Sequence, residues 1–256
     1  FGAAAAGGVF VPINPVLKAE QVVHILRNCG ASILVTTGPR LASLQSSLDE
    51  LDLRAVLVVG EPRQVWGQRS TPCIAWRLGD GSETLCLRPH RVIDTDPAAI
   101  LYTSGSTGLP KGVVLSHRNL VAGARSVVDY LDNEAADRIL CVLPSSFDYG
   151  LSQLTTAFQV GACAVLMNYL FPRDVVRAAA SERITGIAAV PPLWIQLATL
   201  DWPTSVQEHL RYITSSGGVL PRNALAQLRT KLPRVRPFLM YGLTEAFRST
   251  YLPPEE

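Results

Sequence analysis

From residue 99 onward, short apolar runs alternate with longer segments in which apolar residues recur at helical spacing. Short, continuous apolar runs are typical of strands that are buried on both faces. Strands are expected at residues 98–104, 112–117, 138–144, 162–167, 186–192, 211–216 and 237–242, and helices at residues 118–131, 151–160, 173–183, 192–200 and 222–232. This alternation predicts a mostly parallel sheet with helices on both faces, and ligands beyond the carboxyl ends of its strands.

The first sixty residues show the same alternation, with a helix expected at residues 19–29 and strands at 31–37 and 54–60. Between residues 61 and 97 the pattern weakens, and Gly, Pro and Ser become frequent, which predicts loops around a hairpin. Ser116 is expected to cap the helix that follows it. The predicted fold class is therefore α/β, with mostly parallel sheets flanked by helices.

Composition bounds the possible functions. The chain has 256 residues, 48% hydrophobic and 17% charged, which is enough for a large core in one or two domains. Its 23 basic and 21 acidic residues are spread along the chain, so no nucleic-acid partner is expected. The densest basic run, residues 222–236, is interpreted as a solvated helix face, with an anionic-ligand patch as the alternative.

Cysteine usage and hydrophobicity indicate a cytoplasmic protein. The five cysteines, an odd number at irregular spacing, form no C-x-x-C pair, so buried reduced thiols are expected. No apolar stretch reaches the roughly 18 residues that a membrane span needs. Because the chain begins at Phe1, we expect it to be part of a longer protein, and a leader before that residue stays open.

The segment LYTSGSTGLPKGVVLSH, residues 101–117, has the composition of a phosphate-binding loop. Glycines expose backbone N–H groups, the hydroxyls add donors, and Lys111 adds a positive charge. A Walker loop that starts at Gly105 would need glycine at 110 and Ser or Thr at 112, where the chain has Pro110 and Gly112. The dinucleotide and hydrolase glycine motifs also fail, and a flexible surface turn is the alternative.

Residues 103–112, TSGSTGLPKG, resemble the signature loop of the adenylate-forming superfamily, which contains acyl-CoA ligases, luciferases and the adenylation domains of peptide synthetases. Four other segments are similar to motifs of that superfamily in the same order: GGVFVPINP at 7–15, SSFDYG at 145–150, SSGGVLP at 215–221 and YGLTE at 241–245. The resemblance covers essentially the whole chain. The run FDYGLSQL is similar to acyl-CoA ligases associated with exosortase gene clusters.

The resemblance implies ATP-dependent activation of a carboxylic acid to an acyl-adenylate, with release of pyrophosphate and transfer to CoA. This chemistry depends on neutralising phosphate charge. By resemblance, the β- and γ-phosphates are held by Thr103, Ser104, Gly105, Ser106, Thr107, Gly108 and Lys111. A Walker lysine is followed by a hydroxyl residue that holds Mg²⁺, whereas here the metal ligand is expected elsewhere, at Glu245.

The remaining nucleotide contacts are implied in the same way. Thr244 is expected at the α-phosphate, and Tyr241 is expected to stack on adenine. Gly217 and Gly218 are expected to let adenine and the acyl group approach the backbone, which a Cβ would block. Taken alone, Tyr241 could belong to the core and Glu245 could be a solvated charge.

The acid itself is left open by the residues expected to contact it, Phe147 and Asp148. In amino-acid-activating members of the superfamily, an F-D pair supplies the aspartate that holds the α-ammonium group. Here the following residues, Tyr149 and Gly150, depart from the usual pattern. A helix-capping role for Asp148 is the alternative.

Three functions of the superfamily have no counterpart in the sequence: a ribose-binding aspartate, a hinge and the lysine of a small C-terminal domain. The chain is therefore expected to be an incomplete large N-terminal domain that is inactive alone, with one lobe at residues 1–98 and another, carrying the phosphate loop and the adenine and acyl pocket, at 99–256. The expected cofactors are ATP, Mg²⁺ and CoA, and the expected partners are a small carboxylic acid and CoA or a phosphopantetheine carrier. Amino-acid adenylation for a carrier protein and a non-catalytic ATP-binding remnant are the alternatives.

Overall fold

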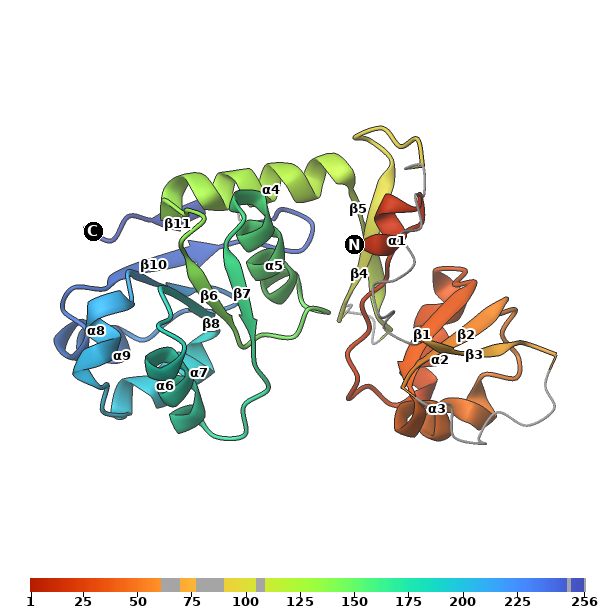
Figure 1. Ribbon diagram of the computed structural model, residues 1–256, viewed down its shortest axis with the longest axis horizontal. Helices are drawn as coiled ribbons and strands as arrows, with labels where there is room; N and C mark the ends of the chain where they lie inside the picture. Colours follow the sequence, from red (N-terminus) through yellow and green to blue (C-terminus); the bar gives the residue numbers. More distant parts are fainter. Residues whose placement is uncertain (61–69, 77–89, 105–108, 248–249, 256) are drawn as a thin grey trace, which may run out of the picture. The chain divides into compact units, whose positions relative to one another are not determined.

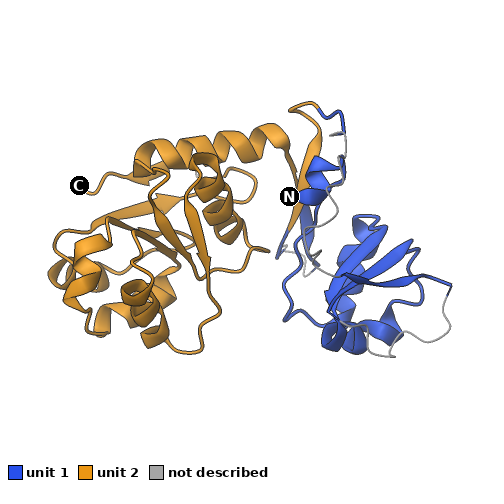
Figure 2. Ribbon diagram, viewed as in Figure 1, with its two compact units in different colours: residues 1–92, 102–112 blue, residues 93–101, 113–256 orange. Residues whose placement is uncertain are grey.

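The computed structural model describes residues 1–60, 70–76, 90–104, 109–247 and 250–255. The chain divides into two compact units (Figure 2). Unit 1 contains residues 1–92 and 102–112, and unit 2 contains residues 93–101 and 113–256. The division into lobes at residues 98 and 99 stays a prediction.

Unit 1 is built on a parallel sheet of three strands in the order β1-β2-β3. Its elements are α1 (Gly2–Ala5), α2 (Ala19–Asn28), β1 (Ile33–Thr37), α3 (Gly38–Leu44), the 3-10 helix η1 (Gln45–Ser47), β2 (Ala55–Val59) and β3 (Cys73–Trp76). Val22 and Leu26 of α2 pack in one core with Leu34 of β1 and with Val56 and Val58 of β2. The helix and the two strands predicted for the first sixty residues are confirmed.

Strand β3 lies in the region predicted to form loops around a hairpin. It pairs in parallel with β2, and the flanking residues 61–69 and 77–89 lie outside the described residues. Because β3 is an edge strand, Ile74 and Trp76 remain 50% and 44% exposed. Its apolar run, CIAW, is only four residues long and stands in a segment rich in Gly, Pro and Ser, so the sequence did not identify it as a strand.

Unit 2 contains a sheet of six strands in the order β11-β10-β9-β8-β6-β7 (Figure 1). Its strands are β6 (Arg138–Cys141), β7 (Cys163–Leu166), β8 (Gly186–Ala189), β9 (Tyr212–Ser215), β10 (Arg236–Tyr241) and β11 (Thr250–Leu252). Strands β6 to β10 are parallel, and β11 pairs antiparallel with β10. The predicted α/β class with mostly parallel sheets is confirmed.

Helices cover both faces of this sheet. They are α4 (His117–Leu131), α5 (Asp148–Val160), α6 (Pro172–Ser181), α7 (Pro191–Thr199), α8 (Thr204–His209) and α9 (Arg222–Lys231). Helices α4 and α5 pack on one face and α6 to α9 on the other (Figure 1). Successive residues of a strand point to opposite faces: Leu140 packs in the core under α6 and α7, whereas Ile139 and Cys141 pack against α5.

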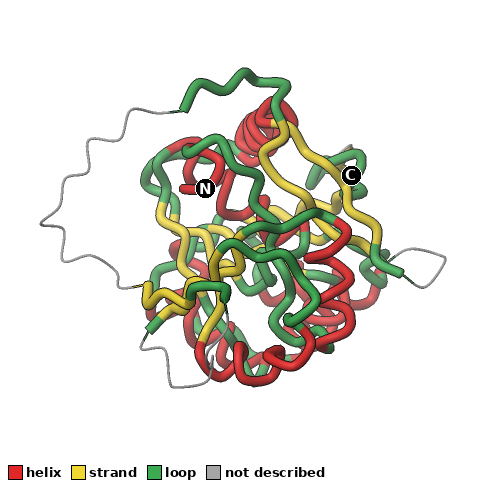
Figure 3. The backbone as a smooth tube through the Cα atoms, turned by 90° about the vertical axis from the view of Figure 1, so that its right-hand side faces the viewer, coloured by secondary structure: helices red, strands yellow, loops and turns green. Residues whose placement is uncertain are grey.

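Two strands stand apart from the large sheet: β4 (Pro97–Thr103) and β5 (Lys111–Ser116) form a sheet of their own. They were predicted as strands, which is confirmed, but they do not extend the parallel sheet. The predicted cap is also confirmed, because the Asn119 backbone N–H donates to Ser116 Oγ over 3.2 Å and the Ser116 N–H donates to Asn119 Oδ1 over 2.9 Å. Figure 3 shows the helices, strands and loops of the backbone in different colours.

The order of the strands reverses at β6. From β6 the chain passes through α5 to β7 on one side, and then through α6 to β8 on the other side of β6. Helix α5 follows β6, and helix α7 follows the neighbouring strand β8. The two helices pack on opposite faces of the sheet. In open α/β sheets, the carboxyl ends of strands at such a reversal are the favoured place for ligands.

Candidate functional site

The carboxyl edge of the parallel sheet in unit 2 carries the residues predicted to contact the acid, adenine, the α-phosphate and the metal ion. Strands β6, β8, β9 and β10 are neighbours and point the same way. Their ends lead to Phe147, Val190, Gly217 and Tyr241 respectively. The sheet thus brings together segments that are far apart in the sequence, and one edge collects the predicted acid and adenine contacts.

The turn between β6 and α5 positions the Phe147–Asp148 pair. The Phe147 N–H donates to Pro144 O over 3.0 Å, and α5 begins at Asp148. A Cβ on Gly150 would lie 2.1 Å from Pro144 O, so this tight turn requires glycine there. The unusual glycine after the F-D-Y sequence therefore has a steric cause.

Asp148 is 5% exposed and lies in the first turn of α5. The N-cap position belongs to Phe147, so the alternative interpretation of Asp148 as the capping residue is wrong. At the first helical position a carboxylate is stabilised by the positive end of the helix dipole. A buried carboxylate so placed beside the end of β6 suits a cationic or hydrogen-bonding part of a ligand.

The loop after β9 approaches Phe147 closely. Gly217 has a φ of +83°, a left-handed conformation in which glycine is strongly favoured. A Cβ at this position would lie 3.6 Å from Val190 Cγ1 and 3.7 Å from Phe147 Cζ, which is ordinary contact. At Gly218 a Cβ would lie 3.5 Å from Pro191 Cγ. Backbone conformation therefore accounts for Gly217 without a ligand, and the predicted approach of adenine stays a prediction.

A small cavity of about 20 Å³ lies between α4, α5 and the sheet of unit 2. Its lining combines apolar and polar side chains: Val127, Leu131, Ile139, Tyr149, Ser152, Gln153, Thr156, Ala188, Tyr212, Thr214 and Met240. The hydroxyls of Tyr149 and Thr214 lie 2.5 Å apart. Within the described part of the chain, the buried Gln153 Oε1 and Thr156 Oγ1 have no hydrogen-bond partner. A cavity of this volume has room for about one water molecule, for which these unsatisfied polar atoms are suitable partners.

These cavity residues are not among those predicted for the site from the sequence. A signal was present, because Tyr149, Ser152, Gln153 and Thr156 follow Asp148 at helical spacing and form a polar yet buried stripe on α5. The partner hydroxyl of Thr214 lies 65 residues away from Tyr149 in the sequence. Only the sheet brings the two together.

The segment after β10 carries the residues expected to contact adenine, phosphate and metal. Tyr241 is 62% exposed, so the interpretation of Tyr241 as a core residue is wrong. Thr244 is buried and Glu245 is exposed, in a turn closed by reciprocal backbone hydrogen bonds of 3.2 Å between Leu243 and Ala246. The turn thus places one hydroxyl and one carboxylate directly beyond the carboxyl edge.

A Mg²⁺ ion at the Glu245 carboxylate requires a bound substrate that supplies further oxygen ligands. Among the described residues, no group of three or more His, Cys, Asp or Glu side chains could hold a metal ion. Mg²⁺ in nucleotide-using enzymes is bound by one or two carboxylates, water and the phosphates of the substrate. The exposed carboxylate of Glu245 meets the protein's share of that requirement.

The glycine-rich segment is described only at its two ends. Thr103 is the half-buried last residue of β4, Ser104 is exposed, and Lys111 is the exposed first residue of β5. All three belong to unit 1. The other predicted phosphate contacts, Gly105, Ser106, Thr107 and Gly108, lie outside the described residues.

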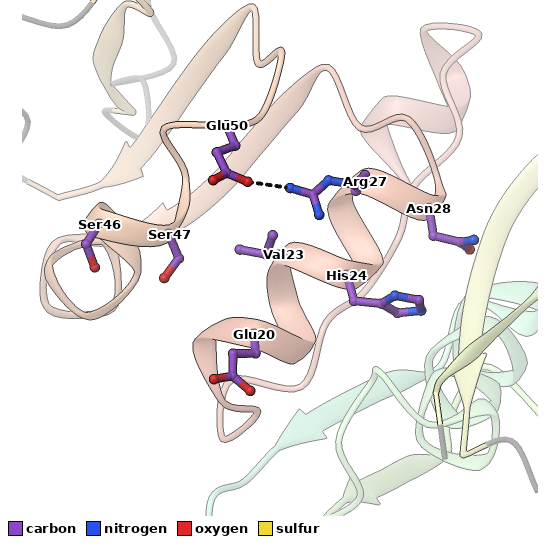
Figure 4. Close-up of a pocket in the computed structure, with 8 residues that line it drawn as sticks. All are labelled: Glu20, Val23, His24, Arg27, Asn28, Ser46, Ser47 and Glu50. Atoms are coloured by element: carbon purple, nitrogen blue, oxygen red, sulfur yellow. Dashed lines mark hydrogen bonds and ion pairs between the residues drawn. The ribbon is translucent and has the colours of Figure 1, made fainter. Parts of the chain in front are cut away.

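A second hollow, a groove of about 590 Å³, lies in unit 1 (Figure 4). It is lined by Glu20, Val23, His24, Arg27, Asn28, Ser46, Ser47 and Glu50. An exposed ion pair of 3.0 Å joins Arg27 to Glu50, and no residue predicted for the site lines the groove. Its mixed charges favour no particular ligand.

The described thiols form no disulfide. Cys29, Cys73, Cys141 and Cys163 are free, whereas Cys86 lies outside the described residues. Of these four, only Cys141 is buried, which raises the pKa of its thiol to about 12 and makes it a poor nucleophile. That the thiols are reduced stays a prediction, and the prediction that they are buried holds, among these four, only for Cys141. No helix in the described ranges is long and apolar enough to cross a membrane.

Comparison with known proteins adds an independent finding. A family model described as "AMP-binding enzyme" matches residues 1–256. The 4-coumarate–CoA ligase 3 of Arabidopsis thaliana is 32% identical in an alignment of 257 positions that covers 96% of this chain and 44% of that protein. Bacitracin synthase 3 of Bacillus licheniformis is 27% identical over 242 residues, which cover 94% of this chain and 3% of that protein.

A solved complex of VinN with 3-methylaspartate is similar over 99% of this chain and 62% of the VinN chain, with 25% identity and a TM-score of 0.75. The chain therefore spans less than two thirds of the solved structure and less than half of each curated relative.

Proposed function

The chain belongs to the AMP-binding enzyme family, and on that basis we propose that its parent protein activates a carboxylic acid with ATP. The products are an acyl-adenylate and pyrophosphate, and the acyl group then passes to the thiol of CoA with release of AMP. The observation that carries the proposal is the family match over residues 1–256, together with one sheet edge that collects the predicted acid and adenine contacts.

In the proposed reaction, a carboxylate oxygen of the acid attacks the α-phosphorus of ATP, and the bond from that phosphorus to the bridging oxygen of pyrophosphate breaks. Negative charges approach one another in this step, so charge neutralisation and positioning supply most of the acceleration. We assign Lys111, Thr103 and Ser104 to the β- and γ-phosphates and Thr244 to the α-phosphate. A Mg²⁺ ion held by Glu245 would neutralise phosphate charge as the pyrophosphate departs.

The remaining residues bind the two organic parts of the substrates. The exposed ring of Tyr241 offers a face on which adenine stacks. We assign the backbone at Gly217 and Gly218, which carries no side chain, to contact with adenine and the acyl group. We assign Phe147 and the buried Asp148, where β6 leads into α5, to contact with the acid.

A second candidate function is adenylation of an amino acid for a carrier protein. The buried carboxylate of Asp148 favours it, because such a group is suited to an ammonium ion. Similarity to a CoA ligase and to a peptide synthetase supports both acceptors. A non-catalytic ATP-binding relative is the third possibility, and it predicts ATP binding without turnover.

Pyrophosphate exchange on the full-length protein tests the proposal. Each acid in a panel of aryl, short acyl, amino and hydroxy acids is supplied with ATP, Mg²⁺ and labelled pyrophosphate. We expect at least one acid to support exchange and Lys111→Ala to slow it while the affinity for the acid is nearly unchanged. Lys18→Ala, which removes another exposed lysine, is the matched control. Binding of ATP without exchange for any acid would favour the non-catalytic alternative.

A further inference from the structure

Helix α2 of unit 1 contacts the residues at both ends of the glycine-rich segment. Tyr102 directly precedes Thr103, and its hydroxyl donates to Asn28 Oδ1 over 2.5 Å. On the other side of the segment, His24 Nε2 lies 3.1 Å from the backbone oxygen of Pro110, which directly precedes Lys111. Both contacts lie within unit 1 and span 74 and 86 residues of sequence.

The chemistry of the two contacts fixes their donors. Pro110 has no N–H, and its carbonyl oxygen can only accept, so His24 carries a proton on Nε2. The hydroxyl of Tyr102 also lies 3.4 Å from Ile25 O, a second acceptor on the same helix. Burial, followed by the nearby Cys29, raises the pKa of the Tyr102 phenol, so this hydroxyl remains a donor well above neutral pH.

Helix α2 is a rigid support for these contacts. Its buried residues Val22 and Leu26 pack in the core of the three-stranded sheet. His24 and Asn28 are four residues apart and therefore lie on the same side of the helix. In Figure 4 both project to the right of α2, whereas Arg27 reaches toward Glu50.

We propose that His24 and Asn28 are positioning residues that hold Thr103 and Lys111 in place for the phosphates of ATP. Through Tyr102 and Pro110, each fixes a residue next to one that we assign to phosphate binding. This inference rests on the proposed function, because the phosphates are those of its substrate. Neither positioning residue itself contacts ATP or the acid.

Loss of either contact should weaken productive binding of ATP and leave the acid unaffected. A neutral hydrogen bond contributes little net free energy, so we expect His24→Leu and Asn28→Leu each to lower kcat/KM for ATP about three- to tenfold. His24→Gln and Asn28→Asp should restore it, because they keep a donor toward Pro110 and an acceptor toward Tyr102. The control is Arg27→Leu, on the same helix, which removes an exposed ion pair and should change nothing.

Hydrogen exchange of the backbone amides separates this inference from the proposed function. Local opening should speed exchange at residues 102–104 and 111–112 in the two leucine variants and leave it unchanged in Arg27→Leu. Where a leucine variant unfolds, Tyr102→Phe removes only a hydroxyl and gives the same readout. A wild-type protein that exchanges pyrophosphate with no acid would overturn the proposed function alone. Wild-type amide protection in every variant would overturn the positioning role.

Discussion

At the scale of single residues, Asp148 decides between the two proposed classes of acid. Its carboxylate is buried at the start of α5, where an ammonium group of the substrate would pair with it. Removal of one partner of a buried charge pair costs about 3–5 kcal/mol. We therefore predict that Asp148→Ala selectively lowers pyrophosphate exchange with amino acids and spares the matching des-amino acids.

The measurement is kcat/KM for matched pairs of acids that differ only in the amino group. Asp148→Asn serves as the control for shape, because it keeps the size of the side chain and removes the charge. Equal losses for both members of each pair would assign Asp148 a structural role and leave CoA ligation of a simple acid as the preferred function.

Gly217 and Gly218 are neighbours with different requirements. An L-residue in the left-handed region costs about 1–2 kcal/mol, so Gly217→Ala should lower the free energy of unfolding by that amount. Gly218 has no positive φ, and a Cβ there would meet Pro191 at an ordinary distance, so Gly218→Ala should be nearly neutral. Urea denaturation of the two variants checks this difference, and equal stability would contradict it.

Glu245 is assigned to Mg²⁺ on its exposure beyond β10 and on the resemblance. Glu245→Gln keeps the size of the side chain and removes an anionic oxygen, so the Mg²⁺ concentration for half-maximal exchange should rise about tenfold, equivalent to about 1.4 kcal/mol. Glu208→Gln, an exposed carboxylate on α8, is the control. An unchanged Mg²⁺ dependence would remove Glu245 from the metal site.

At the scale of elements, a buried ion pair joins the amino ends of the strands in unit 2, at the edge opposite the candidate site. Asp137 is 1% exposed and lies just before β6. Arg211, just before β9, donates to both of its oxygens, with distances of 2.6 and 3.1 Å. Thr185, just before β8, donates to Asp137 Oδ1 over 2.7 Å, and Asn133 donates to Oδ2 over 3.0 Å.

This network predicts a pH-dependent stability. Burial raises the pKa of the Asp137 carboxyl, but the hydrogen bonds from Arg211, Asn133 and Thr185 outweigh it and hold the pKa below the ordinary value of 3.8. The stabilisation is thus complete above the ordinary value and is lost as the pH falls through the lower, folded value. Arg211→Met should cost about 3 kcal/mol at neutral pH, because it leaves a buried charge unpaired.

Urea denaturation of wild type and Arg211→Met at neutral and acidic pH measures this effect. The difference in unfolding free energy should shrink as the pH falls below 3.8. Arg118→Met, which breaks an ion pair whose side chains are both 62% exposed, should change the unfolding free energy much less than Arg211→Met does. A pH-independent loss in Arg211→Met would show that packing of the guanidinium, and not its charge, stabilises the sheet.

The sequence predicted the strands that are continuous apolar runs and the helices whose apolar residues recur at helical spacing. Strands such as β8, buried along its whole length, and amphipathic helices such as α2 and α4 were identified in this way. It missed α3, whose first residues Gly38 and Pro39 are typical of a turn, and the short helix α8. Strand β3 was missed because its apolar run has only four residues and is flanked by segments rich in Gly, Pro and Ser.

For the candidate site, too, the sequence predicts only those features whose residues are close together in the chain. Contiguous motifs such as residues 103–112 and 241–245 can be identified without a structure, because their residues are consecutive. The contact between Tyr149 and Thr214 and the contacts of α2 with Tyr102 and Pro110 depend on residues 65 or more positions apart. Nothing local in the sequence marks such pairs, so they become visible only when the strands are placed in register.

At the scale of the whole molecule, the chain is short compared with the proteins that it resembles. It spans 44% of the similar CoA ligase and 62% of the solved VinN chain, so those proteins contain long segments that have no equivalent among these 256 residues. The resemblance also implies a further lysine and a ribose-binding aspartate that this sequence does not supply. Closure of an active site excludes water and strengthens the contacts to a charged substrate.

We therefore predict that residues 1–256, expressed alone, form acyl-adenylate far more slowly than the full-length parent protein, while still binding ATP through the residues of the candidate site. Pyrophosphate exchange on both proteins, with an acid that the parent activates, measures the difference, and equilibrium binding of ATP controls for folding. A rate within about tenfold of the parent, equivalent to about 1.4 kcal/mol in the barrier, would contradict the prediction. Such a result would mean that Lys111, Thr244 and Glu245 suffice for the chemistry, because positioning and charge neutralisation by these three residues would then account for nearly all of the acceleration.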